Sequence, residues 1–122
     1  MNIKELAIKY EFVAFLCNSQ NEFIEFVNQA TDQIFFSKTW FIDTHIETKE
    51  SILKNYTHTG KSFAIIEIKK LDNKKEFRFY SRDYNKYYID YERVLPNYKI
   101  INFAKYQRKE KLMKINEKFS YR

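Results

Sequence analysis

Glycine is almost absent from this sequence, since Gly60 is the single glycine among 122 residues. Phosphate-binding loops, dinucleotide-binding turns and nucleophile elbows each need several glycines, because their backbones approach a ligand closely or adopt positive φ angles. The sequence therefore argues against these nucleotide-fold and hydrolase chemistries.

Cysteine and long apolar segments are also scarce. Cys17 is the single cysteine, so it has no partner for an intramolecular disulfide or a CxxC zinc motif, and its apolar neighbours predict a buried thiol. No run approaches the roughly 18 apolar residues of a membrane span, and charges interrupt the N-terminal segment, which argues against a secretory signal. We expect a cytoplasmic protein with no membrane, disulfide partner or cofactor.

Acidic residues are scarce in one part of the chain. The formal net charge is +6, yet residues 99–122 hold eight basic and two acidic side chains and the preceding residues are balanced. Leu112, Ile115 and Phe119 give this segment a narrow apolar stripe at helical spacing. We therefore expect a single α+β domain over residues 1–104 and a basic helical tail over 105–122, which docks lightly and exposes its cations.

Apolar residues at helical spacing predict two helices at the start of the domain. The first covers residues 3–17, with a strand over 10–16 as the alternative because Phe12, Val13 and Phe15 favour strands. The second follows the capping box from Ser19 to Glu22 and ends near residue 33.

From about residue 39 the apolar period changes to two, which is typical of strands. The pattern predicts a strand near 40–47, a short helix over 48–56, and strands near 62–70, 75–82, 86–93 and 98–104. The predicted fold is α+β: an N-terminal helical pair packed on a largely antiparallel sheet of four or five strands, with a basic C-terminal helix.

Side-chain pairing predicts the register of the later strands. A turn at residues 72–73 sets Ile66 against Phe79 and Glu67 against Arg78, so that apolar side chains meet and opposite charges meet. A second turn at 83–85 sets Tyr80 against Tyr88. This outer apolar patch either lies under the C-terminal helix or binds a partner.

Two basic regions are candidates for binding an anionic partner. Tyrosines beside cations can stack on bases while the cations hold phosphates. The candidate binding residues are Tyr80, Arg82, Lys86 and Tyr88 on the sheet, and Lys105, Arg108, Lys109, Lys111, Lys114 and Lys118 in the tail.

These features favour a non-enzymatic intracellular binding protein that docks on nucleic acid, or on a nucleic-acid-processing complex, through its sheet and basic tail. Phe, Tyr, Met, Ile, Asn and Lys, whose codons are AT-rich, make up 65 of the 122 residues. An AT-rich genome fits an accessory or inhibitor protein of a phage or mobile element, directed for example against a host defence complex.

A small metal-independent ribonuclease of toxin type is the first alternative. His45 or His58 would act as acid and base, and Lys61, Arg78 and Arg82 would hold the phosphate. Helices followed by an antiparallel sheet resemble the layout of barnase-like and RelE-like toxins, and the resemblance is one of layout only.

The acidic residues leave two further alternatives open. Asp43, His45 and Glu47 alternate along one predicted strand, a geometry that could hold a hard cation, although a solvated strand face is the favoured explanation. Asp43, Glu47 and Glu50 could also form the acidic patch of an immunity protein for a secreted toxin.

Overall fold

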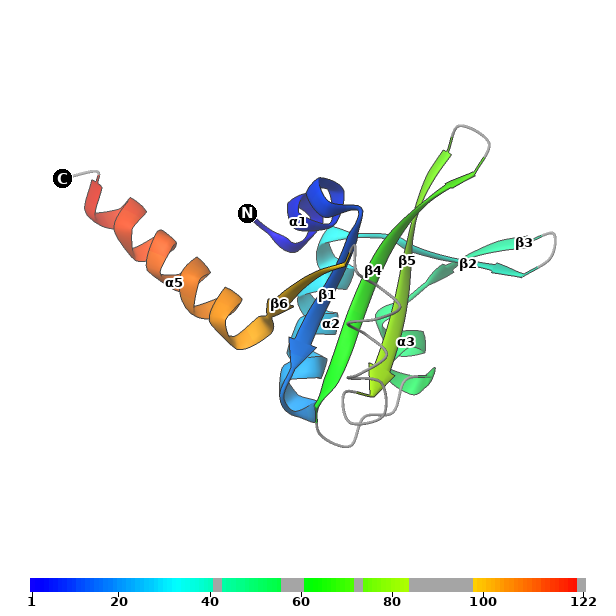
Figure 1. Ribbon diagram of the computed structural model, residues 1–122, viewed down its shortest axis with the longest axis horizontal. Helices are drawn as coiled ribbons and strands as arrows, with labels where there is room; N and C mark the ends of the chain where they lie inside the picture. Colours follow the sequence, from blue (N-terminus) through cyan, green and yellow to red (C-terminus); the bar gives the residue numbers. More distant parts are fainter. Residues whose placement is uncertain (41–42, 56–60, 72–73, 84–97, 121–122) are drawn as a thin grey trace.

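A six-stranded mixed sheet forms the centre of the fold, and four helices belong to the described part of the chain (Figure 1). This computed structural model describes residues 1–40, 43–55, 61–71, 74–83 and 98–120, without the side chains of 38–40, 43–45, 71 and 117–120. The elements in chain order are α1 (Ile3–Tyr10), β1 (Phe12–Cys17), α2 (Gln20–Gln33), β2 (Phe36–Trp40), β3 (Asp43–Glu47), α3 (Lys49–Asn55), β4 (Ser62–Leu71), β5 (Lys74–Asp83), β6 (Lys99–Asn102) and α5 (Phe103–Ser120).

The strand order is β3-β2-β5-β4-β1-β6, with parallel pairing of β1 to β6 and of β2 to β5. The long β4–β5 hairpin has the predicted register: Ile66 lies opposite Phe79, and Glu67 lies opposite Arg78. The predicted strand over residues 86–93 lies outside the described residues. The general α+β prediction is confirmed, but the largely antiparallel sheet of four or five strands is wrong.

The main reason for this error is β1. A helix over residues 3–17 is wrong, because the helix ends at Tyr10 and a strand covers Phe12–Cys17, close to the alternative prediction. Ala14 and Phe15 are both fully buried on opposite faces, so the strand lacks the polar alternation that identifies an exposed strand. β1 lies between β4 and β6, which makes the sheet larger and mixed.

The single strand predicted near 40–47 is also wrong. Two antiparallel strands lie in this region, β2 over Phe36–Trp40 and β3 over Asp43–Glu47. At the described end of β3 the buried side chain is not the one that hydrophobicity suggests, since Glu47 is 7% exposed and Ile46 is 66% exposed. Phe36, which is opposite Glu47 in the ladder, is the residue of this pair that enters the core.

One face of the sheet carries the main core. Side chains from all four described helices join it, among them Ile3 of α1, Phe26 of α2, Ile52 of α3 and Phe103 of α5. Phe26 is a central contact, since its ring lies 4.8 Å from that of Phe15 and 5.3 Å from that of Phe103. Ser19 caps α2 as predicted, with its Oγ accepting from the Glu22 amide at 3.2 Å.

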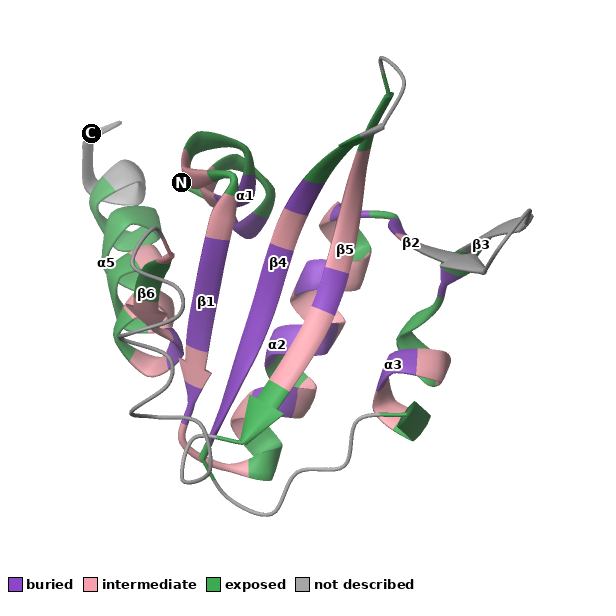
Figure 2. Ribbon diagram, turned by 45° about the vertical axis from the view of Figure 1, so that its right-hand side comes forward, coloured by how far each residue is buried: buried purple, intermediate pink, exposed green. Residues whose placement is uncertain are grey.

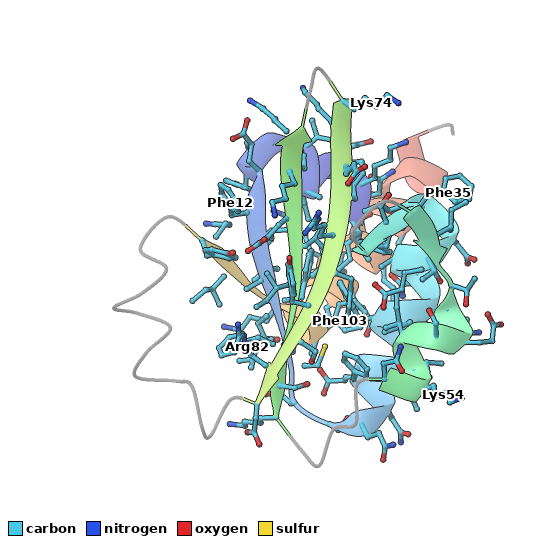
Figure 3. All side chains as sticks on the ribbon, turned by 90° about the vertical axis from the view of Figure 1, so that its right-hand side faces the viewer. Phe12, Phe35, Lys54, Lys74, Arg82 and Phe103 are labelled. Carbon is cyan, nitrogen blue, oxygen red and sulfur yellow. The ribbon has the colours of Figure 1, made fainter. Side chains whose placement is uncertain are left out.

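The opposite face of the sheet carries a smaller apolar cluster of Ala14, Phe63 and Ile65, with Tyr80 and Tyr98 against it. Phe12 and Arg82 lie on this side, away from α2 (Figure 3). The described part of α5 packs in the other core through Phe103 and Tyr106, so of the two arrangements predicted for the Tyr80 patch, cover by the C-terminal helix is not observed.

Candidate nucleic-acid interface

Helix α5 is anchored at its start and extends away from the sheet beyond β6 (Figures 1 and 2). Phe103 is fully buried, and Asn102 caps the helix, its Oδ1 accepting from the Lys105 amide at 3.2 Å. Farther along, Leu112 and Ile115 are 61% and 48% exposed. The predicted light docking of this apolar stripe is therefore not observed among the described side chains, and the split of the chain after residue 104 stays a prediction.

A groove of about 490 Å³ lies between α1, β6 and the first half of α5. We call it the basic groove. Residues from all three elements line it: Met1, Leu6, Lys9, Tyr10, Lys99, Ile101, Asn102, Lys105, Tyr106, Lys109, Glu110 and Met113. Four lysines and two tyrosines thus share one concave surface.

Tyr10 lies beside two of these lysines. The Lys9 Nζ is 5.2 Å from the centre of the Tyr10 ring, and the Lys99 Nζ is 5.6 Å from the same centre. Both distances are in the range of cation–π contacts. Residues far apart in the chain thus place two ammonium groups against one aromatic ring.

A sharp turn positions Tyr10 at the end of α1. Glu11 has φ 60°, and its amide donates to the Ala7 carbonyl at 3.0 Å, which ends the helix. A residue with a side chain seldom adopts positive φ, so the surrounding contacts must hold this turn in place. The Glu11 carbonyl accepts from the Ile68 amide at 3.0 Å and ties the turn to β4.

The charge of the groove is strongly positive. Among the described residues that line it, Glu110 is the one carboxylate, and the terminal ammonium of Met1 contacts its Oε1 at 3.3 Å. Burial, with Glu110 and Glu5 nearby, raises the pKa of Tyr106 to about 12, so its phenol stays a neutral donor at physiological pH. Such a surface suits a polyanion that also has apolar parts.

Comparison with known proteins adds no relative. No protein-family model matches the chain, and neither a curated protein nor a solved structure matches it.

The structure separates the basic residues predicted for the tail. Lys105 and Lys109 line the basic groove, whereas Lys111 and Lys114 line a hollow between α5 and α2. Glu25 also lines that hollow, as does Glu110, so the hollow is less positive than the basic groove. Arg108 is exposed, and the Lys118 side chain is outside the description.

Sequence reasoning missed half of the groove lysines and both of its tyrosines. Lys9 and Tyr10 lie in a segment read as a continuous helix, and Lys99 lies in a short strand that carries no charge pattern of its own. Tyr106 directly follows Lys105, which is one of the predicted binding residues. The available signal was the clustering of basic residues after position 98, which identified Lys105 and Lys109.

The residues considered for a ribonuclease are only partly brought together. Arg78 and Arg82 lie on alternate positions of β5, on the face opposite the helices, and Lys61 is exposed just before β4. His45 lies on β3, which β2 separates from β5. His58 is outside the described residues, as are Lys86 and Tyr88 of the sheet patch.

The metal site considered for Asp43, His45 and Glu47 lies largely outside the described side chains, because those of Asp43 and His45 are not described. Among the side chains that the structure does describe, no group of three His, Cys, Asp or Glu residues is arranged to hold a metal ion. Asp43, His45 and Glu47 all lie on β3, and Glu47 is buried, so the predicted solvated face is not observed at that position. Among the described helices, none is long and apolar enough to cross a bilayer.

The single cysteine is buried as predicted. Cys17 is a free thiol with no exposed surface. Burial, and secondly the Glu22 carboxylate, raise the pKa of this thiol to about 12. A thiol that stays protonated at neutral pH is a poor nucleophile, so Cys17 is a structural residue.

Proposed function

We propose that this protein binds nucleic acid through the basic groove without acting on it chemically. It would serve as an intracellular accessory or inhibitor protein of a phage or mobile element, docking on nucleic acid or on a complex that processes it. The observation that supports this proposal is the convergence of Lys9, Lys99, Lys105 and Lys109 around Tyr10.

The chemistry of the groove fits a nucleotide chain. Its volume of about 490 Å³ lies within the usual size of small-ligand sites, about 300–1,000 Å³. Lysines supply the sequence-independent attraction to phosphates that dominates nucleic-acid affinity. Leu6, Ile101 and Met113 add apolar surface that an inorganic anion would not need.

Fluorescence anisotropy with a labelled oligonucleotide tests the proposal. The Lys99→Ser/Lys105→Ser double variant should bind the oligonucleotide at least about tenfold more weakly, since each lost phosphate contact removes a favourable counterion release. Lys74 and Lys75 are exposed at the tip of the β4–β5 hairpin (Figure 3), and changing both to serine gives a charge-matched control. Equal weakening by both double variants would mean that net charge alone is responsible and would overturn the proposal.

One observation supports a second candidate, the metal-independent ribonuclease. On the sheet face opposite the helices, Glu67 lies across from Arg78, and the Tyr98 hydroxyl donates to the Glu67 carboxylate. Burial raises the pKa of Glu67, although Lys69, Arg78 and Arg82 act to lower it. A carboxylate beside arginines can serve as a general base next to a bound phosphate.

Incubation with total RNA tests this second candidate. Cleavage by the protein that is lost in Glu67→Gln, or in the His45→Ala/His58→Ala double variant, would support it, and intact RNA at high protein concentration would exclude it. Binding without cleavage is the result that the first proposal expects. The immunity-protein alternative stays a prediction, and co-purification with a toxin domain would test it.

A further inference from the structure

We infer that the basic groove takes a single strand of nucleic acid in preference to a duplex, with a base against the Tyr10 ring and the flanking phosphates on the lysines. This inference rests on the proposed function and names its substrate class. DNA and RNA strands share the chemistry concerned, and the experiment below separates them.

The walls of the groove are the first reason. A duplex presents phosphates to a protein surface and keeps the faces of its bases stacked inside, so it makes little use of an apolar wall. A single strand exposes base faces, which bind aromatic and apolar side chains while cations follow the backbone. Leu6, Ile101 and Met113 line the same groove as the four lysines, which matches the second arrangement.

The state of the two tyrosine rings is the second reason. The Tyr106 ring is stacked on Phe103 with centres 6.1 Å apart, and Phe15 meets it at 5.9 Å. It is therefore part of the core wall. Tyr10 is half-buried, and the lysines Lys9 and Lys99 are its ring contacts in the described structure. Tyr10 is thus the ring that a base can reach.

The lysines beside Tyr10 would not block a base. A surface cation–π contact with lysine is weaker than the stacking of a base on an aromatic ring. An incoming strand brings a phosphate on each side of its base, and the two ammonium groups can move from the ring to these phosphates. The exchange replaces two weak contacts by one stacking contact and two charge-assisted hydrogen bonds.

A duplex lying along the outer face of α5 is the competing arrangement, because a projecting basic helix can enter a major groove. The charges on α5 argue against it. Lys111 and Lys114 share their hollow with Glu25 and Glu110, and the exposed Leu112 lies between them in the sequence. In the first half of the helix Lys105 and Lys109 face the groove, which leaves Arg108 as the one described cation of α5 outside both hollows.

Anisotropy titrations with three labelled probes of one mixed sequence test the inference: single-stranded DNA, single-stranded RNA and the DNA duplex. A length of about 12 nucleotides suits typical single-strand site sizes of about 4–16. Both single strands should bind at least about tenfold more tightly than the duplex, which corresponds to about 1.4 kcal/mol. A preference between DNA and RNA identifies the natural strand without affecting the inference.

Two substitutions of Tyr10 make the test specific. Tyr10→Leu should weaken single-strand binding about five- to tenfold and duplex binding by a smaller factor, whereas Tyr10→Phe keeps the ring and should bind single strands like the parent. Circular dichroism and thermal melting verify that each variant is folded. The Lys74→Ser/Lys75→Ser variant again serves as control.

The outcomes separate the inference from the proposed function. The inference would be overturned if the parent bound single strand and duplex with equal affinity and the Lys99→Ser/Lys105→Ser variant bound both more weakly. The proposed function would then still stand. A Tyr10→Leu variant that binds single strands like the parent would also overturn it. Binding of none of the three probes by the folded parent protein would overturn the proposed function, and the inference with it.

Discussion

The four groove lysines make a quantitative prediction about salt. For single strands, log K falls with log salt with a slope of about −0.7 per neutralised phosphate, so four lysines on four phosphates give about −2.8. Replacing Lys99 and Lys105 by serine leaves two contacts and a slope of about −1.4. Raising the salt from 50 to 200 mM should therefore weaken the parent about 50-fold and the double variant about sevenfold.

Anisotropy titrations at a series of salt concentrations measure these slopes directly. The Lys74→Ser/Lys75→Ser control carries the same charge change at a distant hairpin and should keep the parental slope. The reasoning would be refuted by a groove variant whose slope equals that of the parent, because its lysines would then release no counterions on binding. An equal reduction of slope in the control would refute it as well.

Three further predictions concern the fold that supports the groove. Phe103→Ala removes a fully buried ring whose centre lies 5.3 Å from that of the Phe26 ring. Urea titration should show a loss of about 3–5 kcal/mol in unfolding free energy, and oligonucleotide binding should weaken. Unchanged stability would show that α5 is not anchored at this residue. Glu11→Gly should raise the unfolding free energy by up to about 1.5 kcal/mol. A positive φ costs a residue with a side chain about 1–2 kcal/mol, from which the entropy that glycine loses, about 0.5–1 kcal/mol, is subtracted. A fall in the urea midpoint would show that the Glu11 contacts outweigh the strain. The raised pKa of Cys17 means that the folded state holds the thiol proton more tightly than the unfolded state. This contribution to stability should be full below about pH 9 and decline as pH rises toward about 12. Cys17→Ala should flatten the decline in melting temperature, and identical melting profiles for the parent and the variant would contradict the raised pKa.

Local patterns predicted the parts of the fold that local interactions determine. The α2 cap at Ser19 and the register that pairs Ile66 with Phe79 follow from residues close in sequence or joined by one tight hairpin. Across the two strands apolar side chains pair with each other and opposite charges pair with each other. This pairing defines the register uniquely, because a slip of one residue would expose the core side chains.

The errors arose where distant contacts decide. Phe12–Cys17 has apolar residues on both faces, so its periodicity fits a helix or a buried strand, and only the pairing with β4 and β6 selects the strand. Glu47 is buried because Phe36, which lies opposite it on β2, enters the core. The residues of β3 alone do not reveal this pairing.

The candidate site was predictable only in its charge. The excess of basic residues after position 98 identified Lys105 and Lys109, but the groove exists because a turn at Glu11 brings Tyr10 near β6. A site assembled from three elements leaves no motif along the chain. Its detection required the parallel pairing of β1 with β6, which sequence periodicity does not reveal.

Photo-crosslinking tests the central claim most directly. A single-stranded oligonucleotide carrying a photoreactive base is irradiated with the protein, and the crosslinked peptides are identified by mass spectrometry. The basic groove predicts crosslinks in residues 1–10 and 99–113, with Tyr10 among the modified residues. Crosslinks confined to the sheet face around Tyr80 and Arg82, or to the β4–β5 hairpin, would contradict the account.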